Sequence, residues 1–449
     1  MATHDYVIAN QGFPAFRSDL NNALAAIVSN NSSATEPTTM FAHMIWVDTA
    51  ADPSILKIRN ADNDAWITIG SIDQTGDTFI LRPAAGSASA PAYSTSGDTD
   101  TGLFFPSANV LAFAEGGVNR GNLNILGRGL FRKADPTIVA WTKTGTFTAT
   151  TSTTIYVEVN GTVHTIASGA TITMPGSATA GTDYAIWAKT DGTLQATTNH
   201  TSPPTANARK VGGFHYAPGG NATGVSGGDT TPAINALSMY DLKFRPACPD
   251  PRGMTLVAGG FWADIYLCGV DHYTNGTSKY NVTIADGSSL PKISAAFGGN
   301  GSTTYAGGTW FAFNEIMMGV GKKLPTYLEY CALAYGTTEA SSGGTDPGST
   351  ILRAAYTSKW GVMLASGNMW QWSRDFIASG DGSGDWQTGL TETRGNIFTF
   401  NASARAGILG GIWANGSDSG SRCSDWSAAP SHSISSLGGR GVCDHLLLD

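Results

Sequence analysis

The spacing of apolar residues predicts one amphipathic helix near the start of the chain. Within residues 13–29, Phe16, Leu20, Leu24 and Ile27 recur every three or four positions, which places them along one face of a helix. The stripe is narrow, and the neighbouring sequence offers little to cover it. We therefore expect this helix to pack against copies of itself in an oligomer.

Short apolar alternations between turn residues predict β-strands in the next part of the chain. Strands at 44–48, 54–59 and 65–70 form a small hairpin unit, which we assign to an N-terminal region of residues 1–75. Residues 82–102 are rich in Pro, Gly, Ser and Ala and have no apolar period, which in a monomer is typical of a flexible linker. Because three copies around one axis would bury the few apolar residues that flank this segment, we expect a β-rich, intertwined, prism-like shaft over residues 76–133.

The pattern changes after residue 133. Closely spaced strands with Gly turns predict a compact β-sandwich over residues 134–217, and Gly, Asn and Thr dominate a predicted linker over residues 218–237. Aromatic residues become frequent in residues 238–449, where helical spacing at 310–320 and 324–336 predicts two further helices. The predicted fold class is mainly β with a C-terminal α+β domain.

Composition and charge exclude several classes of function. The 449 residues carry a net charge of −8, so the chain lacks the basic surface of a nucleic-acid-binding protein or a polybasic membrane anchor. No apolar stretch reaches the roughly 18 residues of a membrane span, and the first residues do not resemble a signal peptide. We therefore expect synthesis in a cytoplasm, no membrane insertion and no nucleic-acid partner.

The cysteines indicate neither a disulfide scaffold nor a zinc site. There are 5 of them, an odd number, and they are widely spaced at positions 248, 268, 331, 423 and 443. We expect no cofactor. The alternative that stays open is calcium bound by the loop DGSGDW at 381–386, which contains Asp381 and Asp385 but lacks the full ligand set of a known calcium loop.

Three motifs of the last domain carry a resemblance to a known family. KKLPTYLEYCALAYG (322–336), GNMWQWSRD (367–375) and GGIW (410–413) resemble segments of formylglycine-generating enzymes and occur in the same order. Trp370 and Trp372 would share one face of a strand, and Gly410 with Gly411 permits close backbone approach. The resemblance implies a C-type lectin fold of the formylglycine-generating-enzyme type for residues 238–449.

The two ends of the chain narrow the resemblance. YDLKFRPACPDPRGM (240–254) and the final GSR…W…GGRGVCDHLLLD resemble the variable proteins of diversity-generating retroelements. WVDTAADPSILKIRNADNDAWITIG (46–70) and SGDTDTGLFFPSANVLAFAEGGVNR (96–120) resemble phage tail-fibre sequences, whereas the predicted sandwich matches no such motif. The resemblance implies a homotrimeric fibre protein at the distal end of the virion, made in the bacterial host cytoplasm. Its N-terminus would contact baseplate or tail proteins, and its lectin-type domain would bind a protein or glycan receptor on the bacterial surface.

The resemblance also implies which residues display variable side chains and which form their scaffold. The displayed positions are Ile412, Ala414, Asn415, Cys423, Asp425, Ser427, Ala428, His432, Ile434 and Ser435. The scaffold positions are Gly410, Gly411, Trp413, Gly420, Ser421, Arg422, Trp426, Gly438, Arg440, Gly441, Asp444 and His445. A rigid backbone would let the displayed side chains change without loss of the fold.

Enzymatic alternatives remain open at this point. Cys423 and Cys443 would be the thiol pair of a formylglycine-type oxidase, but neither lies in the sequence context of that family, and a structural or displayed thiol is the alternative. A glycan-processing enzyme on the fibre is a second alternative, although no nucleophile–base motif occurs. We therefore predict no catalytic residues and no metal site. We expect Asp444 and His445 to hold the last strand by hydrogen bonds, and Arg422 to pair with an inner carboxylate or with carbonyl groups.

Overall fold

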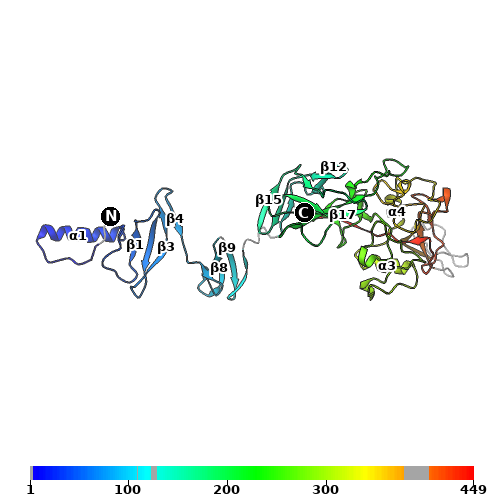
Figure 1. Cartoon of the computed structure of the whole chain (residues 1–449). Coiled ribbons are helices and arrows are strands. Elements are labelled where there is room, and N and C mark those ends of the chain that lie inside the picture. The colour runs from blue at the N-terminus through cyan, green and yellow to red at the C-terminus, as the bar shows by residue number, and fades with distance from the viewer. Residues whose placement is uncertain (1–3, 109, 123–128, 379–403, 449) are drawn as a thin grey trace, which may run out of the picture. The chain divides into compact units, whose positions relative to one another are not determined.

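The computed structural model describes residues 4–108, 110–122, 129–378 and 404–448. The chain divides into two compact units, residues 1–126 and 127–449 (Figure 1). Strands predominate over helices in both units, which confirms the predicted mainly β class. None of the helices in these described ranges is long and apolar enough to cross a membrane.

The predicted N-terminal helix is present as α1, Phe13–Val28. Its apolar stripe lies largely in solvent within the single chain: Phe16 and Leu20 are each 39% exposed, and Ile27 is 58% exposed. The buried side of α1 carries only the small residues Ala23 and Ala26. The helix thus presents its large apolar side chains outward in the single chain.

A four-stranded antiparallel sheet follows α1, in the order β1-β2-β3-β4. Its strands are β1 (Ile45–Asp48), β2 (Ser54–Arg59), β3 (Trp66–Asp73) and β4 (Thr78–Leu81). The first three are the predicted strands. The fourth pairs with β3 although it lies beyond residue 75, so this sheet extends past the predicted end of the N-terminal region.

Residues 82–122 form strands of their own. A hairpin joins β5 (Gly86–Ser87) and β6 (Ala90–Pro91), and the sheet β10-β9-β8-β7 contains β7 (Tyr93–Thr95), β8 (Asp98–Ser107), β9 (Val110–Glu115) and β10 (Val118–Asn122). Phe104, Ala112 and Ala114 form a small core within one chain. Phe105 and Phe113 remain 37% and 39% exposed, so the sheet also keeps large apolar side chains on its surface.

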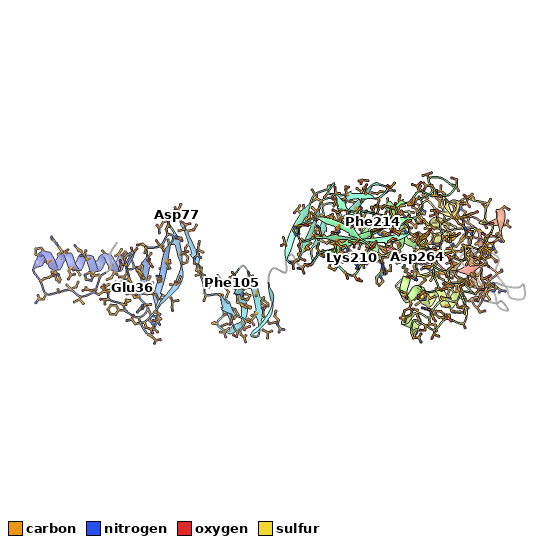
Figure 2. All side chains as sticks on the ribbon, viewed as in Figure 1. Glu36, Asp77, Phe105, Lys210, Phe214 and Asp264 are labelled. Atoms are coloured by element: carbon orange, nitrogen blue, oxygen red, sulfur yellow. The ribbon has the colours of Figure 1, made fainter. Side chains whose placement is uncertain are left out.

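The second unit begins with a β-rich part that has one core. Its strands are β11 (Phe131–Lys133), β12 (Trp141–Gly145), β13 (Thr148–Thr151), β14 (Ile155–Val159), β15 (Thr162–Ile166), β16 (Ile172–Thr173), β17 (Thr182–Ala188), β18 (Leu194–Thr197), β19 (Arg209–Ala217), β20 (Ala233–Ile234) and β21 (Tyr240–Asp241). They form the sheets β11-β14-β15, β12-β13 and β16-β18-β17-β19-β20, with β21 also paired to β19. Trp141, Ile155 and Phe214 are fully buried in the shared core, and Figure 2 labels Phe214.

The segment expected to be a linker, residues 218–237, differs from that expectation. It contains β20, and Ile234 packs into the core of the β-rich part. Gly228 donates a backbone hydrogen bond to Ala354, and Ala222 donates one to Ser358. Residues 218–237 therefore connect the β-rich part closely to the last part of the second unit. Small residues such as Gly allow the main chain to pack against both parts.

The last part of the second unit mixes helices and sheets as predicted. Its helices are α2 (His272–Asn275), α3 (Trp310–Met318) and α4 (Tyr327–Leu333), and its strands are β22 (Phe244–Pro246), β23 (Met254–Val257), β24 (Phe261–Asp264), β25 (Trp370–Ala378), β26 (Ala404–Leu409), β27 (Ser424–Asp425), β28 (Leu437–Gly438) and β29 (Val442–Leu447). They form the sheets β22-β29-β24-β23 and β27-β26-β25-β28. Thr326 and Glu329 form a capping box at the start of α4, which explains why that helix begins at Tyr327, directly after Thr326.

Candidate functional site

The predicted displayed positions lie within residues 412–435, which we call the display segment. A buried arginine, Arg440, anchors the chain shortly after this segment. The fully buried guanidinium of Arg440 donates hydrogen bonds to the carbonyl oxygens of Asp264 and Ile265, each at 2.8 Å. It also donates to Oε1 of Gln371 at 2.9 Å and to the carbonyl oxygen of Met363 at 2.8 Å. Burial away from water lowers the pKa of Arg440 to about 10, which leaves it charged at neutral pH. One cation therefore joins its own stretch of chain to three others, at residues 264–265, 363 and 371.

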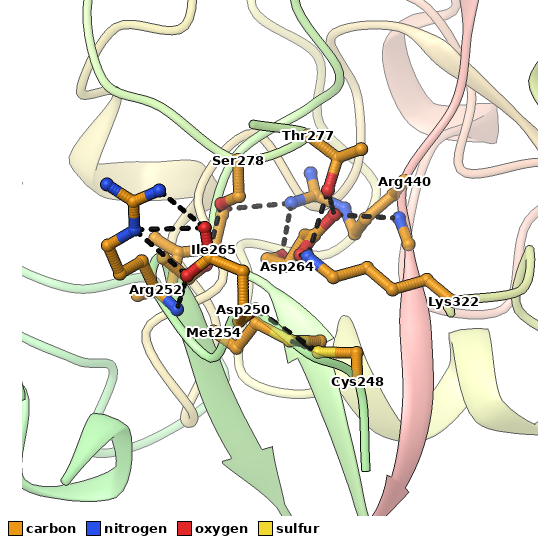
Figure 3. Close-up of polar contacts among 12 residues, drawn as sticks. Cys248, Asp250, Arg252, Met254, Asp264, Ile265, Thr277, Ser278, Lys322 and Arg440 are labelled. Atoms are coloured by element: carbon orange, nitrogen blue, oxygen red, sulfur yellow. Dashed lines mark hydrogen bonds and ion pairs between the residues drawn. The ribbon is translucent and has the colours of Figure 1, made fainter. Parts of the chain in front are cut away.

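An ion pair buried beside Arg440 completes this anchor (Figure 3). Lys322 Nζ lies 2.5 Å from Asp264 Oδ1, and Thr277 Oγ1 donates to Asp264 Oδ2 at 2.8 Å. Burial opposes the charge on Lys322, but the carboxylate of Asp264 holds the pKa of the lysine above its usual value. The Gly441 N–H also donates to Asp264 Oδ2 at 3.2 Å, which ties this ion pair to the residue after Arg440.

Two glycines position the entry to the display segment. Gly410 and Gly411 have φ angles of 101° and 79°, a region that side chains other than glycine rarely adopt. A Cβ atom on Gly410 would collide with the hydroxyl of Tyr330, and one on Gly411 would collide with Ser419. The Gly410 N–H donates to the carbonyl oxygen of Cys423 at 2.8 Å, so the entry and the middle of the segment lie side by side.

Groups outside the display segment hold its main chain at two further points. The carboxylate of Glu339 accepts hydrogen bonds from the Ser421 N–H at 2.9 Å and from Ser421 Oγ at 2.5 Å. Ser342 Oγ donates to the carbonyl oxygen of Trp413 at 2.8 Å and accepts from the Gly416 N–H at 2.9 Å. We call Asp264, Lys322, Glu339, Ser342 and Arg440 the frame.

The two tryptophans predicted as scaffold are both half-buried. Trp413 packs against a cluster of Leu267, Ile284, Leu364 and Met369. Trp426 lies over Gly407, where a Cβ would meet its ring, and its ring centroid is 6.0 Å from that of Tyr327 in an edge contact. Each indole is therefore packed against neighbouring residues and partly exposed.

The structure brings most of the predicted displayed side chains to the surface. Ala414, Ser427, His432, Ile434 and Ser435 are exposed, and Ile412, Asn415, Cys423 and Asp425 are half-buried. Ala428 differs, because it is only 7% exposed and packs in the core with Phe313 and Trp372. Its carbonyl oxygen accepts a hydrogen bond from the Ala406 N–H at 3.0 Å, so the assignment of Ala428 to the displayed set is wrong.

Two of the half-buried positions also shape the backbone. Asn415 Oδ1 accepts a hydrogen bond from the Ile412 N–H at 2.7 Å, and Asp425 Oδ1 accepts one from the Ser427 N–H at 2.7 Å. Side chains of this kind stabilise local turns. Substitution of Asn415 or Asp425 would therefore remove a hydrogen bond that stabilises a turn, and it would also change the side chain at the surface.

Arg422 does not occupy the inner position that the sequence predicted for it. Its side chain is exposed and forms no ion pair with any residue in the described ranges. Only its main chain is held, by a 2.9 Å hydrogen bond from the hydroxyl of Tyr327 to its carbonyl oxygen. Ser421 forms the contact with an inner carboxylate, and Arg440 is the arginine that binds carbonyl groups.

The two residues after Cys443 have different surroundings. Nδ1 of His445 accepts a hydrogen bond from the indole N–H of Trp262 at 2.9 Å, and its ring centroid lies 4.4 Å from that of Phe244. Asp444 is exposed and pairs with Lys323 at 2.7 Å. His445 therefore supports the last strand from within, whereas Asp444 supports it only at the surface.

Sequence reasoning missed most of the frame. Asp264, Lys322, Glu339 and Ser342 lie between 58 and 177 positions along the chain from the residues to which they are hydrogen-bonded. No spacing within one motif points to them. The burial of one arginine predicts that acceptors must exist, but not which residues provide them.

The cysteines and acidic residues give no catalytic or metal arrangement in the described part of the chain. Cys443 faces the thiol of Cys248 and not that of Cys423. No group of three or more His, Cys, Asp or Glu side chains that could hold a metal ion occurs among the described residues. The calcium alternative, with Asp381 and Asp385, lies outside those residues.

Comparison with known proteins relates this chain to phage adsorption proteins. A family model described as "Mtd second domain" matches residues 139–241. The "Tail fiber receptor-binding protein" of Bordetella phage BPP-1 is 52% identical over 332 residues, which cover 71% of this chain and 85% of that relative.

Solved structures agree with the sequence comparison. The P3c and I1 variants of the Major Tropism Determinant are each 45% identical to this chain, with a TM-score of 0.68. Each alignment covers 82% of this chain and 100% of the variant. The chain therefore belongs to the family that includes the tail-fibre receptor-binding protein of Bordetella phage BPP-1 and the Major Tropism Determinant.

Proposed function

We propose that this chain is a phage tail-fibre receptor-binding protein that attaches the particle to its bacterial host through the display segment. One observation carries the proposal. The main chain of the display segment is held by groups outside it, Glu339 and Ser342, while side chains such as His432 and Ile434 extend into solvent. Because the chain belongs to a family of receptor-binding proteins, we assign receptor binding to these exposed side chains.

The chemistry of the exposed side chains suits recognition of a surface and not of a small molecule. They comprise small residues, one histidine and one apolar residue, Ile434, and they lie on a face whose backbone does not depend on them. Individual contacts of this kind are weak, and several linked copies raise the overall affinity without any new contact.

A homotrimer would supply those copies. The exposed apolar stripe of α1, with Leu24 50% exposed and Ile27 58% exposed, supports self-association, because lone apolar stripes in water favour helix–helix packing. Exposed Phe105 and Phe113 on the second sheet support the intertwined shaft in the same way. Residues 1–75 would then contact the baseplate or tail, with residues 238–449 at the distal end of the virion.

The display segment is also proposed to be a diversified region. The predicted variable positions other than Ala428 are exposed or half-buried in this segment, and the frame would let their side chains change without loss of the fold. A near-copy of the 3′ end of the gene, next to a reverse-transcriptase gene, is the expected genomic signature.

The enzymatic alternatives receive no support. A formylglycine-type oxidase would require Cys423 and Cys443 to act as a pair, whereas the thiol facing Cys443 belongs to Cys248. The relatives described above are named as receptor-binding proteins and tropism determinants.

Competition for host cells tests the proposal. Pre-incubation of cells with the purified full-length protein should reduce adsorption of the phage that carries it. The variant His432→Asp/Ile434→Asp should not compete, because two carboxylates alter the face without touching the frame. Val163→Asp, an exposed site in the β-rich part, is the matched control and should compete as the wild type does. Equal competition by the display variant and the control would exclude the display segment as the binding site.

A further inference from the structure

Cys248 lies two residues beyond the end of β22 and, if the register of that strand is continued, opposite Cys443 on the neighbouring strand β29. In the antiparallel pairing of β22 with β29, Pro246 is the partner of His445. The Ala247 N–H donates to the carbonyl oxygen of Asp444 at 2.9 Å, which continues the same register by one residue. The next pair in this register is Cys248 with Cys443.

The hydrogen-bond pattern gives this pair a geometry that suits a cross-link. Leu448 donates to Lys243 at 2.8 Å and Ala247 donates to Asp444 at 2.9 Å, so the hydrogen-bonded pairs alternate and the cysteines fall at a non-hydrogen-bonded position. At such positions the Cα atoms are about 4.5 Å apart and both side chains point to the same face. Disulfides span Cα separations of roughly 4.4 to 6.8 Å, so the strands need not separate or shift register to form one.

The surroundings of the two thiols distinguish their roles. Both are buried, and they pack in one cluster with Met254 and Trp262. A hydrogen bond from the Cys248 thiol lowers the pKa of Cys443, and the nearby ammonium of Lys322 acts in the same direction. Figure 3 shows Cys248 beside Met254, whose sulfur lies 3.5 Å from Sγ of Cys248. Cys443 is therefore the thiol that ionises first.

We propose that Cys248 and Cys443 form a disulfide once the protein has left a reducing cytosol, and that this bond ties β29 to β22. The Cys443 thiolate attacks one sulfur of a low-molecular-weight disulfide, forms a mixed disulfide and displaces one small thiolate. Cys248 then loses its proton and attacks the Cys443 sulfur, which displaces the second small thiolate. The protein loses two protons and two electrons, and the small disulfide is reduced to two thiols.

The position of β29 determines how an oxidant reaches the two cysteines and which part of the chain the disulfide would constrain. Leu447, at the end of this strand, is 45% exposed, so opening of the strand from that end admits the oxidant to the buried pair. The disulfide would close a loop from Cys248 to Cys443, and this loop contains the frame and the display segment. The proposal does not depend on receptor binding by that segment.

Peptide mapping of the full-length protein tests the cross-link. The protein is incubated with glutathione disulfide at about pH 8 in mild denaturant, so that β29 opens, and is then returned to native buffer. It is next alkylated in strong denaturant without reductant and digested. We expect a peptide that links Cys248 to Cys443, with Cys268, Cys331 and Cys423 alkylated. The oxidised protein should melt at least about 3 °C above the reduced protein, and dithiothreitol should remove the difference.

Variants separate this pair from other thiols. Cys443→Ser should abolish the linked peptide, and Cys331→Ser, at a half-buried thiol, is the matched control that should retain it. Full alkylation of both Cys248 and Cys443 after oxidation would overturn the proposal, as would a link from Cys443 to any other cysteine. The mapping of the wild-type protein decides the question even if a serine variant does not fold.

Discussion

Replacement of Arg440 by methionine should destabilise the second unit, residues 127–449, without altering any displayed side chain. Methionine has a similar length but no donor, so the carbonyl oxygens of Asp264, Ile265 and Met363 and the side-chain oxygen of Gln371 lose their partner. Each unsatisfied buried acceptor costs about 1–3 kcal/mol, and local relaxation recovers part of the total. We therefore expect a loss of about 3–5 kcal/mol in the free energy of unfolding, near the lower end of the summed cost of four unsatisfied acceptors.

Denaturant unfolding of the full-length protein, followed by tryptophan fluorescence, measures this loss. Arg422→Met is the matched control, because Arg422 is exposed and lies in the same part of the chain. That control should change the unfolding free energy by less than about 0.5 kcal/mol. If Arg440→Met is as stable as Arg422→Met, the buried arginine does not support the display segment and the description of the frame is wrong.

Three further predictions concern single positions. Gly411→Ala should lower the unfolding free energy by about 1–3 kcal/mol, because its φ of 79° strains any Cβ and the methyl group would meet Ser419; a melting temperature equal to that of the wild type would contradict this. Ala428→Asp should cost at least about 3 kcal/mol because the carboxylate would be buried, whereas Ser427→Asp, its exposed neighbour, should cost less than about 0.5 kcal/mol; equal melting temperatures for the two variants would refute the burial of Ala428. Stability should fall as pH falls below about 6.5, because burial lowers the pKa of His445 from its usual 6.5 and the unfolded state therefore takes up the proton first. A His445→Gln variant should lose less stability between pH 7 and pH 5 in the same unfolding assay, and an identical pH slope would show that another group is responsible.

Local patterns predicted the elements of this protein well. The helical spacing of Phe16 and Leu20 predicted α1, and the motif that contains Trp372 predicted a core strand whose indole is fully buried. Patterns of this kind depend on neighbouring residues, so one sequence suffices to detect them. The resemblance of short motifs likewise predicted the family that the comparisons demonstrate.

Contacts between distant residues could not be predicted in this way. Ala428 lies among small residues that look interchangeable, and only its place beside Phe313 shows that it belongs to the core. Arg422 and Arg440 both follow glycine-rich motifs, and nothing local distinguishes the exposed arginine from the buried one. The facing cysteines, 248 and 443, depend on a strand register that no spacing along the chain reveals.

The central claim is that the display segment binds the host while the frame maintains the fold. The direct test is equilibrium binding of purified protein to host cells, measured together with the melting temperature. The test variant replaces the exposed positions Ala414, Ser427, His432, Ile434 and Ser435 with the side chains Ser, Asn, Tyr, Thr and Asn, respectively. We predict at least a tenfold loss of binding with a melting temperature within about 2 °C of the wild type, because exposed substitutions have small effects on stability. Unchanged binding, or a loss of binding accompanied by a large drop in melting temperature, would contradict the account.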